Sequence, residues 1–329
     1  MKKKLYPVLL IALFIVSGTV SCVTRGVAQA EEYFSIGMAY FEMGKFAEAE
    51  TWLNRARTAD KTMLASEYNL GRIAFETGHY KEAAGYFENI LKKDPDNTMA
   101  LKAAAYTRIK NGDFEKAEAH YTRVLELIPE SADDGYNYAL VLYGLQKYED
   151  CERVLNKYPF ALEEKAPSVL LLARAQREMG RVEAIDTFAK WIIVNSGTPN
   201  PQGFLEYARV LEKAEFYARA LEQYNDAIKA NTKDTATLKK STIRFEKSRL
   251  LLTVDPDNEE GLKEFTDAVN EGFSDIEAIE ALVLDKRINQ VHRDEIQKIL
   301  DETKIKMDNK KKDNEEEEEE EEEETEASA

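Results

Sequence analysis

Few residues in this chain have the type and spacing that catalysis requires. The three histidines, His79, His120 and His292, stand far apart, and none has the His-Glu-x-x-His spacing of a zinc protease. Gly44-Lys45 matches only the end of a phosphate-binding loop, because no glycine lies five residues before Gly44. We therefore predict no enzyme activity, no cofactor and no metal site. The remaining chemistry is binding chemistry, carried by aromatic and arginine residues that recur along the chain.

The stretch over residues 64–97 has the pattern of two helices joined by a turn. Gly71 and Ala83 are small where the two helices would cross, so larger side chains around them can interlock. Gly78 allows the positive φ that ends a first helix. Pro95 ends the second helix because it cannot continue one. The apolar residues placed around these breaks are Leu70, Tyr80 and Phe87.

The same residue types recur with a period of 34 residues. Gly71 is preceded at this spacing by Gly37 and followed by Ala105. Since one helix pair alone buries too little apolar surface, such units must stack on one another. Three units keep this register, a fourth breaks phase after Tyr158-Pro159, and two looser units follow. We predict six units over residues 30–234.

This pattern resembles the tetratricopeptide-repeat family over about two-thirds of the chain. The resemblance implies an all-α fold, namely a right-handed superhelix (α-solenoid) of about six helix-turn-helix repeats plus divergent C-terminal helices. It also implies an inner groove, lined by the first helix of each unit, that binds a protein or peptide ligand. The inward positions give the expected partner-binding residues, which are Phe34, Phe41, Tyr68, Arg72, Phe75, Lys102, Tyr106, Tyr136, Tyr143, Arg174, Arg177 and Arg209.

Two interpretations stay open for these residues. Each aromatic side chain is either a ligand anchor or a core residue that packs against the helix of the next unit. Arg174, Arg177 and Arg209 would favour a carboxylate-bearing or acidic ligand. The charges of Arg174 and Arg177 would otherwise be offset by Glu206 or Glu212 of the following unit.

The beginning of the chain resembles the signal peptide of a bacterial lipoprotein. Residues 1–21 contain three lysines, an apolar stretch and a run of small residues that ends at Cys22. The resemblance implies that Cys22 is the lipidated first residue of the mature protein, followed by a tether over residues 22–29. Simple secretion and an uncleaved anchor are the alternatives.

Cys151 is the only other cysteine. It takes the small-residue position that Ala83 has in the second unit, and it has neither a cysteine partner nor a nearby histidine. We predict that Cys151 is a buried small hydrophobic residue with no redox role.

The end of the chain changes in composition after residue 234. Residues 235–308 read as a helical capping region, in which Asp255-Pro256-Asp257-Asn258 repeats the letters of Asp94-Pro95-Asp96-Asn97, and Ser274 with Glu277 forms a capping box. Residues 309–329 contain an unbroken run of glutamates and are expected to form a disordered acidic tail. This tail either has no binding role and is simply solvated, or it attracts a basic partner or divalent cations electrostatically.

The charge of the chain argues against nucleic acid as a ligand. The formal net charge is −17, and setting aside the eleven glutamates of the tail and the three N-terminal lysines leaves −9. Such a body repels phosphate backbones.

The function expected from these features is that of a membrane-anchored scaffold. It would bind a protein or peptide partner in the bacterial cell envelope, facing the periplasm or the cell surface. The alternatives are an accessory subunit that docks the solute-binding protein of an uptake transporter, and an assembly subunit of outer-membrane machinery.

Overall fold

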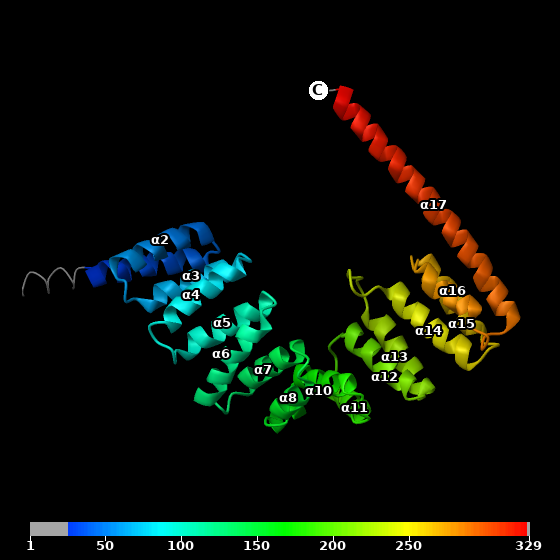
Figure 1. Cartoon of the computed structure of the whole chain (residues 1–329), viewed down its shortest axis with the longest axis horizontal. Helices are drawn as coiled ribbons and strands as arrows, with labels where there is room; N and C mark the ends of the chain where they lie inside the picture. The colour runs from blue at the N-terminus through cyan, green and yellow to red at the C-terminus, as the bar shows by residue number, and fades with distance from the viewer. Residues whose placement is uncertain (1–25, 328–329) are drawn as a thin grey trace, which may run out of the picture. The chain divides into compact units, whose positions relative to one another are not determined.

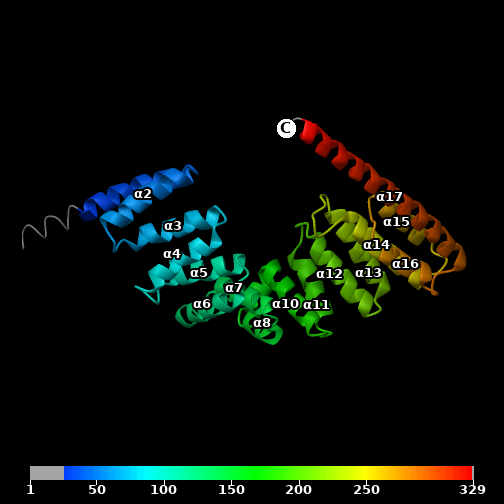
Figure 2. The same cartoon turned by 45° about the horizontal axis from the view of Figure 1, so that its top comes forward.

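The computed structural model describes the backbone of residues 26–327 and the side chains of residues 26–309. This part of the chain consists of helices joined by short turns, with no strand among the described residues (Figures 1 and 2). The prediction of an all-α helical-repeat fold is confirmed. The chain divides into two compact units, one ending at Met179 and the other beginning at Gly180. Each unit is described by itself.

The first unit is a series of antiparallel helix pairs in which each helix packs against the next. A helix over residues 26–42 precedes α2. The bounds of the others are α2 Phe46–Ala59, α3 Leu64–Glu76, α4 Tyr80–Leu91, α5 Thr98–Lys110, α6 Phe114–Leu127, α7 Ala132–Gly144, α8 Tyr148–Leu155, α9 Pro159–Glu164 and α10 Ala166–Glu178. The short α8 and α9 together take the place of one second helix before α10.

The second unit continues with helix pairs and ends in one long helix. Its helices are α11 Ala184–Val194, α12 Pro201–Lys213, α13 Tyr217–Ala230, α14 Lys240–Val254, α15 Glu259–Asn270, α16 Ile276–Leu284 and α17 Gln290–Ala327. α12 packs against α13, α13 against α14, and α14 against α15. The sequence did not indicate the division at Met179, which falls inside the array predicted for residues 30–234.

The turns inside the helix pairs keep a stricter period than the sequence suggested. The left-handed backbone needed there occurs at Gly44, Gly78, Gly112, Gln146 (φ 59°) and Gly180, each 34 residues after the last. The prediction that the phase breaks after Tyr158-Pro159 was therefore wrong. The repeat could not be followed by its glycines alone, because the turn residue at position 146 is glutamine. Glu215 (φ 62°) has the same left-handed backbone in the turn between α12 and α13.

The predicted interlock around Gly71 and Ala83 is confirmed. A Cβ atom on Gly71 would lie 2.7 Å from the ring of Phe87, so only glycine lets α3 approach α4 this closely. Ala83 is fully buried and Phe87 is 2% exposed. Phe87 also contacts Tyr68, with ring centroids 5.4 Å apart.

The repeated four-residue sequence forms the same turn twice. The side chain of Asn97 accepts a hydrogen bond from the backbone N–H of Ala100 at the start of α5. Asn258 accepts the equivalent bond from Gly261 at the start of α15. An N-terminal cap of this kind satisfies a backbone donor that the helix leaves unpaired.

One prediction for the C-terminal region was wrong. The cap of α16 is Asp275, whose side chain accepts from the N–H of Ala278, so Ser274 does not begin a capping box. The backbone of α17 is helical through Ala327, and the disorder expected for residues 309–329 stays a prediction. No glycine or proline follows Gly272 in the sequence, and glutamate has a high helix propensity, so nothing in the backbone chemistry ends this helix.

The N-terminal predictions fall outside the described residues. These are the signal peptide over residues 1–21 and the lipidated Cys22 with the start of its tether. Among the residues that the structure covers, no helix combines the length and apolar character needed to cross a membrane.

Candidate functional site

The expected partner-binding residues lie on the first helices of successive pairs. In the first unit these are the helix over residues 26–42, α3, α5, α7 and α10, and in the second unit α12. Residues three or four apart share a face of a helix, which brings Tyr68, Arg72 and Phe75 onto one side of α3. The repeat therefore presents a comparable face on every first helix.

Most of the expected aromatic anchors are partly buried against the core of the first unit. Phe34 and Phe41 pack beside the buried Leu53 and Leu70. The others divide between two further buried clusters, Tyr68 and Phe75 in one and Tyr136 and Tyr143 in the other. Burial raises the pKa of Tyr136, and the nearby positive charge of Arg174 opposes that rise.

Arg72 links two neighbouring first helices through an aromatic ring. Its guanidinium carbon lies 4.4 Å from the ring centroid of Phe41, which is a cation–π contact. Nη1 of Arg72 also donates to Oδ1 of Asn69 at 3.0 Å. These contacts orient a half-buried arginine at the surface of α3.

Tyr106 is the most open of the expected aromatic residues. It is 40% exposed on α5, and its ring centroid lies 5.6 Å from that of Phe75 on α3. Nζ of Lys110 lies 5.4 Å from the Tyr106 centroid. Lys110 was not among the predicted residues, although its position four residues after Tyr106 places it on the same helix face.

Lys102 is held in an ion pair. Its Nζ lies 2.5 Å from Oδ2 of Asp134 on α7. Asp134 is only 5% exposed and also accepts a hydrogen bond from the hydroxyl of Ser131. A charge paired in this way offers less to a ligand than the sequence suggested.

The three expected arginines are placed in different surroundings. Arg177 donates from Nε and Nη2 to Oε1 of Glu178, its neighbour in sequence. Arg174 lies near Tyr136, as the effect on that pKa indicates. Arg209 belongs to the second unit, so the structure does not place it together with the other two.

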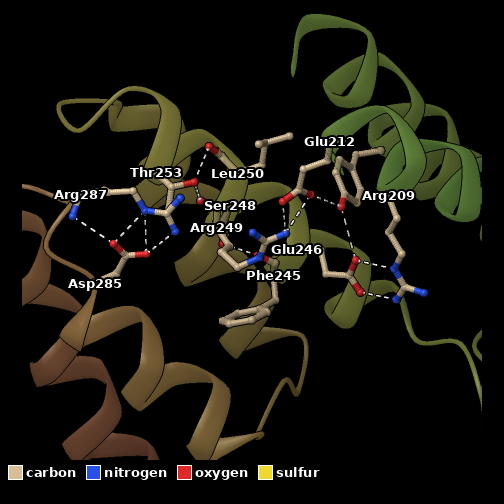
Figure 3. A network of polar contacts seen from close by, with 11 residues as sticks. Arg209, Glu212, Phe245, Glu246, Ser248, Arg249, Leu250, Thr253, Asp285 and Arg287 are labelled. Carbon is tan, nitrogen blue, oxygen red and sulfur yellow. Dashed lines mark hydrogen bonds and ion pairs between the residues drawn. The ribbon is translucent and has the colours of Figure 1, made fainter. Parts of the chain in front are cut away.

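Arg209 takes part in a polar network that joins α12 to α14 (Figure 3). Its Nε and Nη2 donate to the two carboxylate oxygens of Glu246 at 2.8 and 2.5 Å. Arg249 donates from Nη2 to both oxygens of Glu212 at 2.6 and 2.8 Å. The buried hydroxyl of Tyr224 donates to Glu212 at 2.8 Å and lies 3.4 Å from Glu246.

The electrostatics of this network keep its arginines charged and its tyrosine neutral. The hydrogen bond to Glu246 raises the pKa of Arg209. Burial alone lowers the pKa of Arg249, but the bond to Glu212 outweighs burial and the net shift is upward. Burial and the carboxylates of Glu246 and Glu212 raise the pKa of Tyr224, so its hydroxyl stays protonated and remains a donor.

Glu246 and Arg249 were not predicted from the sequence, although a signal for them exists. They lie 37 residues after Arg209 and Glu212, which is one repeat plus three residues of loop. The charges at equivalent positions are exchanged, so that arginine on one helix meets glutamate on the next. Had α14 been assigned as a further first helix, its inward positions would have included both residues.

Other reactive side chains form no site among the described residues. No group of three or more histidine, cysteine, aspartate or glutamate residues in that part of the chain could hold a metal ion. Cys151 is fully buried, as predicted, and burial raises the pKa of its thiol to about 12. Nε2 of His120 lies 3.0 Å from Oε1 of Glu88, which also pairs with Arg108.

Comparison with known proteins identifies the repeat. Residues 30–62 and 68–132 each match a family model described as tetratricopeptide repeat. A tetratricopeptide-repeat protein from Parabacteroides merdae ATCC 43184 has a similar structure, with 20% identity, a TM-score of 0.57 and coverage of 78% of this chain and 98% of that chain. Both matched stretches are therefore tetratricopeptide repeats.

Two curated proteins resemble parts of the sequence. An uncharacterized lipoprotein of Treponema pallidum (strain Nichols) is 25% identical over 163 residues, which are 50% of this chain and 83% of that protein. The human protein O-mannosyl-transferase TMTC3 is 26% identical over 128 residues, covering 38% of this chain but 14% of the human protein. The matched part of the transferase is too small a share of it to transfer its activity.

Proposed function

We propose that this protein is a membrane-anchored scaffold that binds a protein or peptide partner in the bacterial cell envelope, without catalysis. The family and the lipoprotein named above support the coarse function and the anchoring. The finer claim concerns the surface that binds the partner. We place it on the first helices of the first unit.

The observation that carries this proposal is the open cluster of Tyr106 and Lys110 beside Phe75. An aromatic ring that is 40% exposed, supported from one side by a second ring and flanked by a cation, is an amphipathic anchor. Tyrosine and arginine are enriched at the positions that carry most of the binding energy in protein interfaces. Arg72 extends the same kind of surface to α3.

A photo-crosslinking amino acid placed at residue 106 tests this surface in cells that produce the full chain. The control carries the same amino acid at Lys81, an exposed position on α4, a second helix. We expect a light-dependent adduct at residue 106 and none at residue 81. Equal adducts at both positions, or none at residue 106, would contradict the proposal.

The identity of the crosslinked protein separates the alternatives. A soluble solute-binding protein would indicate an accessory subunit of an uptake transporter, and a β-barrel protein would indicate outer-membrane assembly. Any other envelope protein would leave the general scaffold function.

Anchoring is tested separately at Cys22. Mass spectrometry of the N-terminal peptide is expected to show acyl chains on this residue, and more than one chain gives stable anchoring. Cys22→Ser is expected to release a soluble form or to trap the precursor in the membrane. An unmodified Cys22 in the membrane fraction would show that the lipoprotein proposal is wrong.

A further inference from the structure

The second unit contains a polar pocket of about 690 Å³ between α12 and α14. This volume lies within the range of about 300–1,000 Å³ that is usual for ligand pockets. Its lining residues come from α12, the turn after it, the start of α13, α14 and the segment between α16 and α17. Four of them are cationic, and these are Arg209, Lys213, Arg249 and Arg287.

The arginines of this pocket are oriented by carboxylates but retain unused donors. A guanidinium group has five N–H donors. Arg249 uses only Nη2 in its bonds to Glu212, and Arg209 uses Nε and Nη2 in its bonds to Glu246. Arg287 is held in the same way by Asp285, through Nε and Nη2. Guanidinium groups fixed in this way lose little freedom when a further acceptor binds.

Two of the three carboxylates that line the pocket are already occupied, and the third, Glu215 in the turn after α12, is exposed. Glu246 accepts both bonds from Arg209, and Glu212 accepts from Arg249 and from Tyr224. Unused hydrogen-bonding capacity in the pocket is therefore mainly donor capacity, on the arginines and on the exposed Lys213. A ligand that supplies acceptors fits this arrangement better than a cation does.

The pocket also has an apolar side. Val254 is 46% exposed and Leu250 lies buried behind it on α14. The half-buried ring of Tyr217, at the start of α13, lines the pocket as well. A ligand with an apolar group next to its acceptors would contact both sides.

We propose that this pocket binds an acidic peptide segment of a partner, with carboxylates at Arg249 and Lys213 and a neighbouring apolar side chain at Val254 and Tyr217. The proposal rests on the scaffold function above and names the chemistry of a second contact. It does not depend on the surface around Tyr106. Carboxylate binding to arginine is a charge-assisted, directional interaction, and the three arginines are already oriented for it by their own carboxylate partners.

The test is fluorescence anisotropy with the purified full chain and a short fluorescein-labelled peptide of alternating glutamate and leucine. A peptide with glutamine in place of glutamate is the ligand control. We expect saturable binding of the acidic peptide only, weakened by added salt. Lys213→Glu is expected to weaken binding about tenfold, since it removes one charge-assisted contact and adds repulsion.

A matched variant separates the pocket from the overall charge. Lys263→Glu makes the same change in net charge at an exposed position on α15, outside this pocket, and is expected to bind like the wild type. Tighter binding after removal of Glu315–Ala329 would also support the proposal, because that segment carries the chain's own run of glutamates.

Several results would overturn the proposal. These are equal binding by wild type and Lys213→Glu, equal binding of the two peptides, and no binding of the acidic peptide. Binding to anionic vesicles that is lost in Lys213→Glu, without peptide binding, would assign the pocket to a membrane. Each of these outcomes can occur while the crosslink at residue 106 still forms, so failure here and failure of the scaffold proposal are distinguishable.

Discussion

The first helices of the two units meet their neighbours through different side chains. In the first unit, Arg72 lies over the ring of Phe41 and Phe75 lies against Tyr106. In the second unit, α12 and α14 are joined by two arginine–glutamate pairs with a tyrosine hydroxyl between them. One repeat geometry therefore accepts either aromatic contacts or paired charges at equivalent positions.

The same contrast extends into the cores. The first unit buries Phe87, Tyr121 and Leu70 almost completely. The second unit also buries aromatic rings, but it places Lys247 at 4% exposure between Glu260 and Glu264. Arg244 pairs with Glu264 as well. Paired charges in a core respond to pH, whereas apolar contacts do not, so the stability contributed by the Lys247 cluster is expected to depend on pH and that contributed by Phe87 is not.

The largest expected effect is in the aromatic core of the first unit. Phe87→Ala removes the ring that fills the space above Gly71 and is expected to destabilise the protein by about 3 to 5 kcal/mol. Chemical denaturation of this variant at two pH values checks the size of the loss and its independence of pH. A loss below about 1 kcal/mol would contradict the close contact described here.

A smaller, pH-dependent effect is expected at Glu264 in the second unit. Glu264→Gln leaves the buried Lys247 without one of its two carboxylates and is expected to cost about 2 to 3 kcal/mol at neutral pH, less than removal of a fully buried partner. Burial raises the pKa of Glu264, but hydrogen bonds from Lys247 and Arg244 outweigh burial and lower it from 4.5.

The sign of the pH effect follows from that lowered pKa. Because the unfolded state takes up the proton first, the stability contributed by Glu264 is fully present above pH 4.5 and is lost as pH falls through the folded-state pKa. The difference between wild type and Glu264→Gln is therefore expected to shrink in acid. A constant difference across this range, measured by denaturation, would rule out the ion-pair explanation.

The smallest expected effect concerns the turns, where the two units behave alike. Gln146 in the first unit and Glu215 in the second have left-handed backbones that glycine adopts without cost. Gln146→Gly is expected to stabilise the protein by about 0.5 kcal/mol, since relief of backbone strain slightly exceeds the added freedom of the unfolded chain. Gln146→Ala, which keeps the strain, is the control and is expected to give no gain. Stabilisation by alanine would show that backbone strain is not the cause.

The repeat itself could be predicted from the sequence because its positions are set by steric demands on single residues. Glycine at residue 71 and alanine at residue 83 are required by close helix contact, and glycine at residue 78 by the positive φ of the turn. The burial of Cys151 was predicted because it has the same position in its repeat as Ala83. Each of these depends on a local rule that one residue type satisfies.

The remainder depends on which side chains meet across helices. The helical period predicted the helix face on which Tyr68, Tyr136 and Tyr143 lie. It did not predict which side chains of neighbouring helices pack against them. The pairing of Lys102 with Asp134 likewise needed the stacking of α5 on α7. The charge exchange between α12 and α14 was hidden by the three extra residues of loop before α14.

The open first-helix surface of the first unit is the proposed binding site for the partner. The most direct measurement is recovery of that partner with the double variant Tyr106→Ala with Lys110→Glu, quantified by mass spectrometry after capture from cells. The matched control is Leu127→Ala with Lys81→Glu, because Leu127 on α6 is 36% exposed and Lys81 is an exposed lysine. The two double variants are expected to melt alike, since Tyr106 and Leu127 have similar exposed fractions of 40% and 36% and both lysines are exposed.

We expect recovery to fall about tenfold or more in the first double variant and to stay unchanged in the control. Full recovery with the Tyr106 variant, or an equal loss in both, would contradict the claim.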